Sequence, residues 1–210
     1  TNPYKVWLSE IMLQQTRVKT VIPFYNSWVA KFPTIKSVAE TNMDSLLKMW
    51  EGLGYYARVR NFHAACVVVM NRFGGSVPDN YQDFQSLPGV GPYVAGAVMS
   101  IAYNLPFPAV DGNAYRVVSR IKSINLPFNS CKNELVKFLS DHISLNRPGD
   151  FNQAIMDLGR EICTSKNPSC DVCPIQKNCC AFVNNTVELK LPPDIFLRFW
   201  GNTICSLQNL

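Results

Sequence analysis

Residues 87–98 read LPGVGPYVAGAV, a segment in which two prolines and two glycines directly precede an apolar run. Gly89 and Gly91 permit backbone angles that a side chain disfavours, so LPGVG predicts a tight turn between two helices. The amides that begin the second helix then face outward and can bind an anion such as a DNA phosphate. An ordinary turn between helices has the same pattern, so this segment alone leaves the function open.

The composition is that of a globular protein with one large core or two smaller ones. Apolar residues make up 47% of the 210 residues, and no apolar run approaches the roughly 20 residues of a membrane span. Lysine and arginine exceed aspartate and glutamate by 20 to 15, a mild excess that fits an anionic partner without demonstrating one. The first residues lack the charged and apolar regions of a secretory signal, which favours an intracellular protein.

Helical periodicity dominates the chain. Asn2 and Pro3 fit the N-cap and the first residue of a helix, and Gly74 with Gly75 fits a helix stop. No stretch shows the sustained alternation of a strand. The sequence therefore predicts an all-α protein. Apolar residues recur at three- and four-residue spacing in residues 6–22, 45–53, 62–73, 93–103 and 134–143.

Five of the eight cysteines lie in CTSKNPSCDVCPIQKNCC, residues 163–180. A C-x2-C pair brings two thiolates to one metal centre, and two flanking cysteines complete a four-thiolate site. Zinc and an iron–sulfur cluster both accept four thiolates, so the spacing leaves the metal open. Disulfides are disfavoured because nothing indicates export. Cys180 is an alternative last ligand with a longer spacing. The C-x6-C-x2-C-x5-C set is Cys163, Cys170, Cys173 and Cys179.

Two carboxylates lie in unusual surroundings. A single glutamate on a helix usually faces solvent, but Glu10 in LSEIML has apolar neighbours nearly all round. Desolvation raises a carboxyl pKa toward values suited to proton donation. Asp111 in VDGN precedes a helix, where it is expected to act as an N-cap and where the helix terminus favours its charge.

An aromatic pair follows a glycine-containing turn. Tyr55 and Tyr56 come directly after residues 52–54, with Arg58 and Arg60 close behind, so a DNA duplex can contact aromatic and cationic groups together. The alternative is that one tyrosine lies in the core and the arginines are merely solvated. For Tyr56 we expect the core position.

Together these motifs resemble the helix-hairpin-helix DNA glycosylases that carry a 4Fe-4S cluster, and in particular the MutY family of adenine DNA glycosylases. The similarity runs from about residue 3 to residue 180, in segments 9–16, 52–61, 87–97, 110–117 and 151–159. It implies a helix-hairpin-helix barrel lobe over 1–105, an iron–sulfur cluster lobe over 106–182, a DNA-binding cleft between the lobes, and an irregular tail or linker over 183–210. It also implies a 4Fe-4S cluster rather than zinc.

The resemblance implies roles for individual residues. Glu10 protonates the adenine and later handles the attacking water, while Asp111 stabilises the positive charge that develops on the deoxyribose. Asn113 positions a phosphate or Asp111. Tyr93 stands where lyase-competent relatives carry a Schiff-base lysine, so the chemistry stops at base hydrolysis. Gln15 and Tyr55 probe the base opposite the target adenine. The full DNA-binding set is Gln15, Tyr55, Arg58, Gly89, Gly91 and Lys166.

We therefore expect a monomeric, monofunctional glycosylase that removes adenine mispaired with 8-oxoguanine or guanine in double-stranded DNA. Its compartment would be the nucleus, also the mitochondrion, in a eukaryote, or the cytoplasm in a bacterium. The alternatives are a thymine or oxidised-pyrimidine glycosylase of the same superfamily and a non-catalytic DNA-binding iron–sulfur protein. MutY proteins continue into a Nudix-like domain that residues 183–210 do not resemble. We therefore expect a fragment with a weaker preference for A:8-oxoguanine over A:G.

Overall fold

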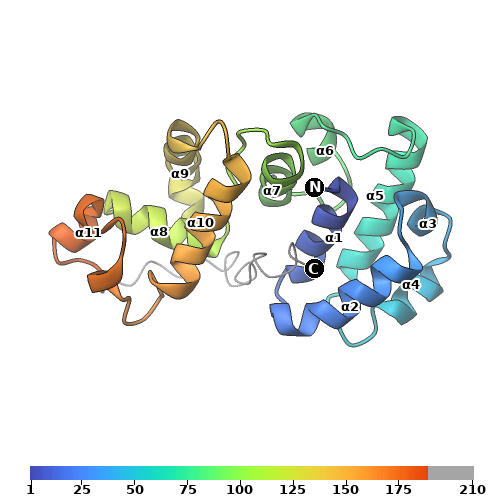
Figure 1. Ribbon diagram of the computed structural model, residues 1–210, viewed down its shortest axis with the longest axis horizontal. Coiled ribbons are helices and arrows are strands. Elements are labelled where there is room, and N and C mark those ends of the chain that lie inside the picture. Colours follow the sequence, from blue (N-terminus) through green and yellow to red (C-terminus); the bar gives the residue numbers. More distant parts are fainter. Residues whose placement is uncertain (189–210) are drawn as a thin grey trace.

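A computed structural model describes residues 1–188, and these residues form helices and loops without a strand (Figure 1). The all-α class is confirmed. None of the described helices is long and apolar enough to cross a membrane. The α-helices are α1 (Pro3–Leu13), α2 (Val18–Lys31), α3 (Ile35–Ala39), α4 (Met43–Met49), α5 (Ala57–Phe73), α6 (Tyr81–Gln85), α7 (Pro92–Tyr103), α8 (Gly112–Lys122), α9 (Phe128–His142), α10 (Pro148–Glu161) and α11 (Cys180–Val183). Two short 3-10 helices, η1 (Cys170–Val172) and η2 (Gln176–Asn178), lie between α10 and α11.

The helix ends follow local sequence signals, with one exception. The Asn2 side chain accepts a hydrogen bond from the Lys5 amide at 3.2 Å, as an N-cap does. Gly74 ends α5 with a φ of 61°. The periodic stretch 6–22, however, is two helices, because α1 ends at Leu13 and α2 begins at Val18. Both helices pack on the same core, so the apolar spacing continues across a break that periodicity does not reveal.

The buried apolar side chains form two clusters. The larger lies among α1–α7 and contains three tryptophans with no exposed surface, Trp7, Trp28 and Trp50. The smaller lies around α8 and α9 and is built from Tyr115, Val118, Cys131, Leu135 and Leu139. Figure 1 shows α1–α7 on one side of the molecule and α8–α11 on the other. This grouping supports the proposed two lobes, whereas the boundary at residue 105 and the tail over 183–210, which lies beyond the described residues after 188, stay predictions.

Two glycines allow backbones to approach closely near the junction of these groups. A Cβ on Gly96 of α7 would lie 2.2 Å from the Pro108 carbonyl oxygen. A Cβ on Gly159 of α10 would lie 2.6 Å from the Asn113 Cβ. Both distances are shorter than any real contact, so a side chain at either position would displace its neighbour. The absence of a side chain at these two glycines therefore allows the 104–111 connection and the start of α8 to pack closely against α7 and α10.

Candidate active site

Glu10 lies in the last turn of α1 and is buried in the core. Its exposed fraction is 1%, and the Tyr93 hydroxyl donates a hydrogen bond to Glu10 Oε2 at 3.0 Å. The other oxygen, Oε1, is buried and has no hydrogen-bond partner within residues 1–188. Burial raises the pKa of Glu10 to about 8, although the Tyr93 hydrogen bond lowers it, and the Asp111 charge adds a further increase. The predicted desolvation is confirmed, and Glu10 is mostly protonated at neutral pH.

Tyr93 stays a phenol under these conditions. Burial raises its pKa well above the ordinary value, and the charges of Glu10 and Asp111 raise the pKa further. Its hydroxyl therefore remains a hydrogen-bond donor to Glu10 throughout the physiological pH range.

Asp111 has two well-defined hydrogen bonds and no exposed surface. Its Oδ1 accepts from the Ala114 amide at 2.7 Å, and its Oδ2 accepts from Asn113 Nδ2 at 2.9 Å. The predicted N-cap of α8 is confirmed. Donors to both oxygens and the positive end of the α8 dipole all favour the charged carboxylate.

A chain of hydrogen bonds runs from Asp111 to the cysteine loop. Asn113, which donates to Asp111, accepts from Arg116 Nη2 at 2.8 Å. Arg116 Nε in turn donates to the Cys163 carbonyl oxygen at 2.8 Å. Sequence reasoning missed Arg116, although an arginine three residues after Asn113 on the same face of a helix was an available signal.

The turn at residues 86–91 joins α6 to α7. Gly89 has a φ of +75°, and a Cβ there would lie 2.7 Å from the Asn61 Cβ, so the requirement for glycine is confirmed. The prediction that Gly91 also needs backbone angles that a side chain disfavours is wrong, because Gly91 is the N-cap of α7 with an ordinary φ of −86°. No side chain caps the first amides of α7, and these amides are the ones predicted to bind a phosphate.

Gln15 and Tyr55 lie in two loops that adjoin the barrel helices. Gln15 has a φ of +58° and Tyr55 has a φ of +49°. Tyr55 is 55% exposed and is available to a partner. The expected core position of Tyr56 is wrong, since this ring is 40% exposed.

The expected DNA contact of Arg58 is also contradicted by its position. The side chain is buried, with an exposed fraction of 8%, and burial lowers its pKa to about 10. Its guanidinium donates to carbonyls that end α1 and to carbonyls that precede α5, which otherwise have no partner in a helix. These five acceptors are the carbonyl oxygens of Ile11, Met12, Gln14, Leu53 and Gly54.

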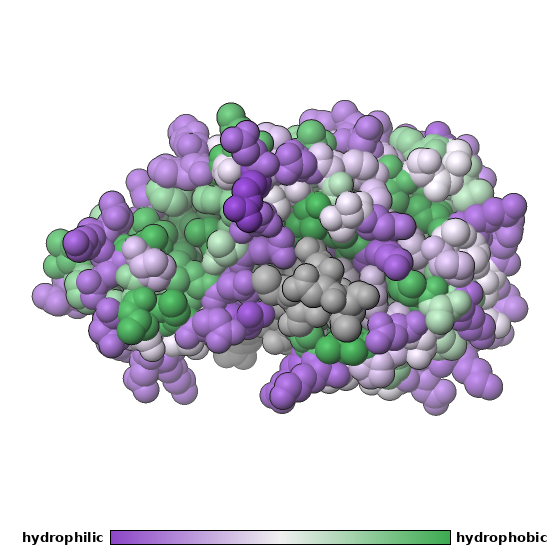
Figure 2. All heavy atoms as spheres, viewed as in Figure 1, coloured by the Kyte–Doolittle hydropathy of each residue, from purple (hydrophilic) through white to green (hydrophobic). Residues whose placement is uncertain are grey.

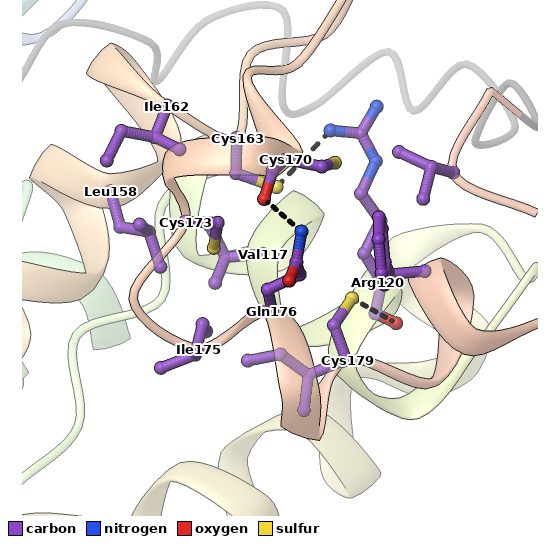
Figure 3. A pocket seen from close by; sticks show the side chains of 13 residues that line it. Val117, Arg120, Leu158, Ile162, Cys163, Cys170, Cys173, Ile175, Gln176 and Cys179 are labelled. Carbon is purple, nitrogen blue, oxygen red and sulfur yellow. Dashed lines mark hydrogen bonds between the residues drawn. The ribbon is translucent and has the colours of Figure 1, made fainter.

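The cysteine loop forms a pocket against α8 and α10 (Figure 3). Its four lining cysteines are those of the predicted set, and they are not paired in disulfides. Cys180 is exposed and does not line the pocket. Arg120 Nη1 donates to the Cys163 sulfur at 3.2 Å. The other walls are mainly aliphatic and include Val117, Leu158, Ile162 and Ile175.

The four thiols that line this pocket are the donor set of a group with four thiolate ligands. Tetrahedral zinc requires four sulfurs at about 2.3 Å from one point. Among the described residues, no group of three or more histidine, cysteine or acidic side chains converges in this way. Four thiols on the rim of one apolar pocket suit a larger group with four thiolate ligands. The donor set and its surroundings therefore fit a 4Fe-4S cluster.

The surface near this loop carries few unpaired charges. Lys166 is exposed in the loop, whereas Arg160 lies within 3.0 Å of Asp157 and 2.8 Å of Glu161. Figure 2 shows hydrophobic residues interspersed with hydrophilic ones on the face that it draws. Lys177 is also exposed in this loop, so exposure does not single out Lys166, whose phosphate contact stays a prediction.

Comparison with known proteins establishes the family. Residues 8–135 match the family described as HhH-GPD superfamily base excision DNA repair protein. The chain belongs to this superfamily. The matched region contains the tight turn before α7 and the Asp111 segment that follows that helix.

Adenine DNA glycosylases are among the similar curated proteins. The one from Buchnera aphidicola subsp. Baizongia pistaciae is 41% identical over 184 residues, which cover 88% of this chain and 52% of that protein. The one from Schizosaccharomyces pombe is 43% identical over 188 residues, which cover 88% of this chain and 41% of that protein. The HhH-GPD chain thus spans about half or less of the length of these relatives.

Solved structures support the same fold. A thermostable thymine-DNA glycosylase superposes with a TM-score of 0.81 at 28% identity, covering 87% of this chain and 85% of the other. A trapped endonuclease III–DNA covalent intermediate superposes with a TM-score of 0.76 at 23% identity, covering 88% and 86% of the two chains, and shows the fold alone. The endonuclease III-like fold of this HhH-GPD chain is therefore shown.

Proposed function

We propose that this chain is the catalytic part of a monofunctional adenine DNA glycosylase acting on adenine opposite 8-oxoguanine or guanine. The observation that carries the proposal is the pairing of a buried Glu10, whose surroundings favour its protonated form, with Asp111, whose hydrogen-bond donors favour its charged form. These states match the two tasks of N-glycosidic hydrolysis, proton donation and charge stabilisation. The relatives named adenine DNA glycosylase, at 41% and 43% identity, support adenine as the base.

The reaction begins when the adenine leaves the helical stack and enters the site. Glu10 donates its proton to a ring nitrogen, and the bonding electron pair of the N-glycosidic bond moves to the departing base. The sugar becomes oxocarbenium-like, and the Asp111 carboxylate stabilises its positive charge. Water adds to the anomeric carbon and returns a proton to Glu10. The product is free adenine and an abasic site.

Tyr93 explains why the proposed reaction stops at the abasic site, without cleavage of the DNA backbone. A lyase requires an amine to form a Schiff base with the sugar, and a phenol cannot form one. The Tyr93 hydroxyl instead donates to Glu10, at 3.0 Å, and orients that carboxyl group. The predicted absence of lyase activity follows from this chemistry.

The cysteine loop supplies the cofactor site in this proposal. The residues that would hold a 4Fe-4S cluster are Cys163, Cys170, Cys173 and Cys179. When bound, the cluster would cross-link the loop through these thiolates and would supply a redox-active group. The chain's own residues do the glycosidic chemistry. Arg116 is hydrogen-bonded to both the loop and Asn113, and Asn113 is hydrogen-bonded to Asp111, so the position of the loop influences the position of Asp111.

DNA binding would involve the barrel face and the loop. The uncapped amides of α7 after Gly89 and Gly91 bind a phosphate, and Lys166 binds a second one. Gln15 and Tyr55 contact the base opposite the adenine. The protein acts as a monomer in a compartment that contains DNA, namely the nucleus, the mitochondrion or the bacterial cytoplasm.

A second candidate is a thymine-DNA glycosylase, which the superposition with such an enzyme at 28% identity favours. Single-turnover assays on A:8-oxoguanine, A:G and T:G duplexes separate the two. We expect release of adenine from the first two duplexes and no release of thymine. Release of thymine alone would replace the adenine proposal, and DNA binding without release of any base would indicate a non-catalytic protein.

A further inference from the structure

Gln15 and Tyr55 share an unusual backbone although 40 residues separate them in the sequence. Their φ angles are +58° and +49°, values that residues with a side chain seldom adopt. Such conformations persist where the surrounding structure imposes them. A cause common to both loops would be a side chain that contacts each of them.

Arg58 supplies this cause. Its Nη1 donates to the Gln14 carbonyl oxygen, and its Nη2 donates at 3.1 Å to the Gly54 carbonyl oxygen, which also accepts from Trp50 Nε1 at 3.0 Å. Each acceptor belongs to the residue directly before a strained one, so each hydrogen bond fixes the peptide plane that precedes Gln15 or Tyr55. The same guanidinium is anchored further by the carbonyl oxygens of Ile11, Met12 and Leu53.

The Arg58 guanidinium makes its contacts inside the protein. The Gln15 and Tyr55 side chains, by contrast, are not fully paired there. Arg58 is 8% exposed, and its guanidinium carbon lies 5.4 Å from the ring centroids of both Trp50 and Tyr55. Tyr55 is 55% exposed. Gln15 Oε1 is buried without a hydrogen-bond partner in the described part of the chain. Tyr55 is therefore open to an external partner, Gln15 has a buried oxygen that a change of rotamer could offer to the same partner, and Arg58 is kept away from it.

We propose that Arg58 is a positioning residue that clips the two loops together, so that Gln15 and Tyr55 enter a DNA duplex as one preorganised unit. The inference rests on the proposed function in taking DNA as the partner. Arginine suits this role because its planar fork presents donors in two directions, whereas a lysine ammonium is a single point. A preorganised pair also loses less conformational freedom on binding than two independent loops.

Hydrogen–deuterium exchange without DNA tests the clip directly. In Arg58→Lys we expect the amides of residues 14–17 and 52–56 to exchange about tenfold faster, because both loops lose the same anchor. Arg60→Lys is the matched control, since Arg60 is exposed on the same helix, and it should leave both loops unchanged. Unchanged exchange in Arg58→Lys, or faster exchange in only one loop, would overturn the proposal. This result does not depend on whether the protein is a glycosylase.

DNA binding provides the second measurement. We expect Arg58→Lys to lower the preference for an A:8-oxoguanine duplex over a fully paired one by about tenfold, through misplacement of the probing side chains. In Arg58→Met, which removes the positive charge, the salt dependence of binding to the fully paired duplex should not change, because the buried guanidinium is directed at backbone carbonyls and not at a phosphate. A smaller salt slope would show that Arg58 does reach the backbone, and would overturn the proposal.

If Arg58→Lys does not fold, variants that retain Arg58 can still test the proposal. Gln15→Ala and Tyr55→Ala should each lower mispair preference, and the double variant should lose little more than the worse single one. Simple addition of the two losses would show that the side chains act independently and would overturn the clip. A wild-type protein without any mispair preference would refute the proposed function instead, and the exchange experiment would still decide the role of Arg58.

Discussion

Glu10 and Asp111 are both buried carboxylates, yet their surroundings are opposite. Glu10 has one hydrogen bond, from Tyr93, and one oxygen without a partner in the described residues. Asp111 has a donor at each oxygen and lies at the start of α8. Burial without enough donors raises the pKa of Glu10 to about 8, whereas the donors around Asp111 favour its charged form.

The difference shows how one site can hold an acid and an anion side by side. The apolar barrel core offers Glu10 few hydrogen-bond donors, which favours the protonated carboxyl group until a base accepts its proton. The α8 terminus and Asn113 supply donors to Asp111, and these donors favour its charged form. Helix position, rather than residue type, therefore separates the two roles in the proposed reaction.

Replacement of Glu10 should have the largest effect. Glu10→Gln keeps the shape of the side chain but removes its acidic proton, so we expect single-turnover adenine release to fall by about 10³-fold. Binding to the mispaired duplex should be retained, which a gel-shift measurement would check. Activity within tenfold of the wild type would remove Glu10 from the role of acid.

Replacement of Asp111 should have the next largest effect, and it separates charge from capping. Asp111→Asn retains an oxygen that caps the Ala114 amide but removes the negative charge, so we expect release to slow by about 10²-fold. Its side-chain NH2 would also face the Asn113 Nδ2 donor, so the melting temperature should fall as well. Asp111→Ala also loses the cap, which should cost about 1 kcal/mol of stability. An Asp111→Asn enzyme of normal rate would reduce Asp111 to a structural cap.

Displacement of the Asp111 support should have a smaller effect. In Gly159→Ala the new Cβ would meet the Asn113 Cβ at 2.6 Å, and the shift should reach Asp111 through the Asn113 hydrogen bond. We expect release to slow by about tenfold. Gly149→Ala is the matched control, because it lies in the same helix and crowds the Ile101 Cα at 2.9 Å, away from Asn113. Equal loss of rate in both variants would indicate general destabilisation.

The contrast between the carboxylates was only partly predictable from the sequence. Apolar neighbours of Glu10 and the position of Asp111 before a helix are local signals, and both gave the correct surroundings. The Arg58 position was not predictable, because its acceptors at the end of α1 lie 44 to 47 residues away and become neighbours only in the fold. The Arg116 link to Cys163, across 47 residues, was hidden for the same reason.

Tyr93→Phe should have the smallest effect at neutral pH and a distinctive one at high pH. Proton donation needs the protonated form of Glu10, so the wild-type rate should decline as pH rises through about 8. The Tyr93 hydroxyl stabilises the Glu10 carboxylate and thereby lowers its pKa. Without that donor the pKa of Glu10 is higher, and the decline in rate moves to higher pH.

The pH profile of Tyr93→Phe also separates two roles of the hydroxyl. At pH 7 most Glu10 is protonated in either protein, so the rate should fall only by about tenfold or less, through loss of orientation. At pH 9 the variant should retain a larger fraction of its own maximum than the wild type does. A parallel loss at both pH values would mean that the hydroxyl orients Glu10 without setting its pKa. The contrast between the two carboxylates would then depend on the donors around Asp111 and not on the Tyr93 hydrogen bond.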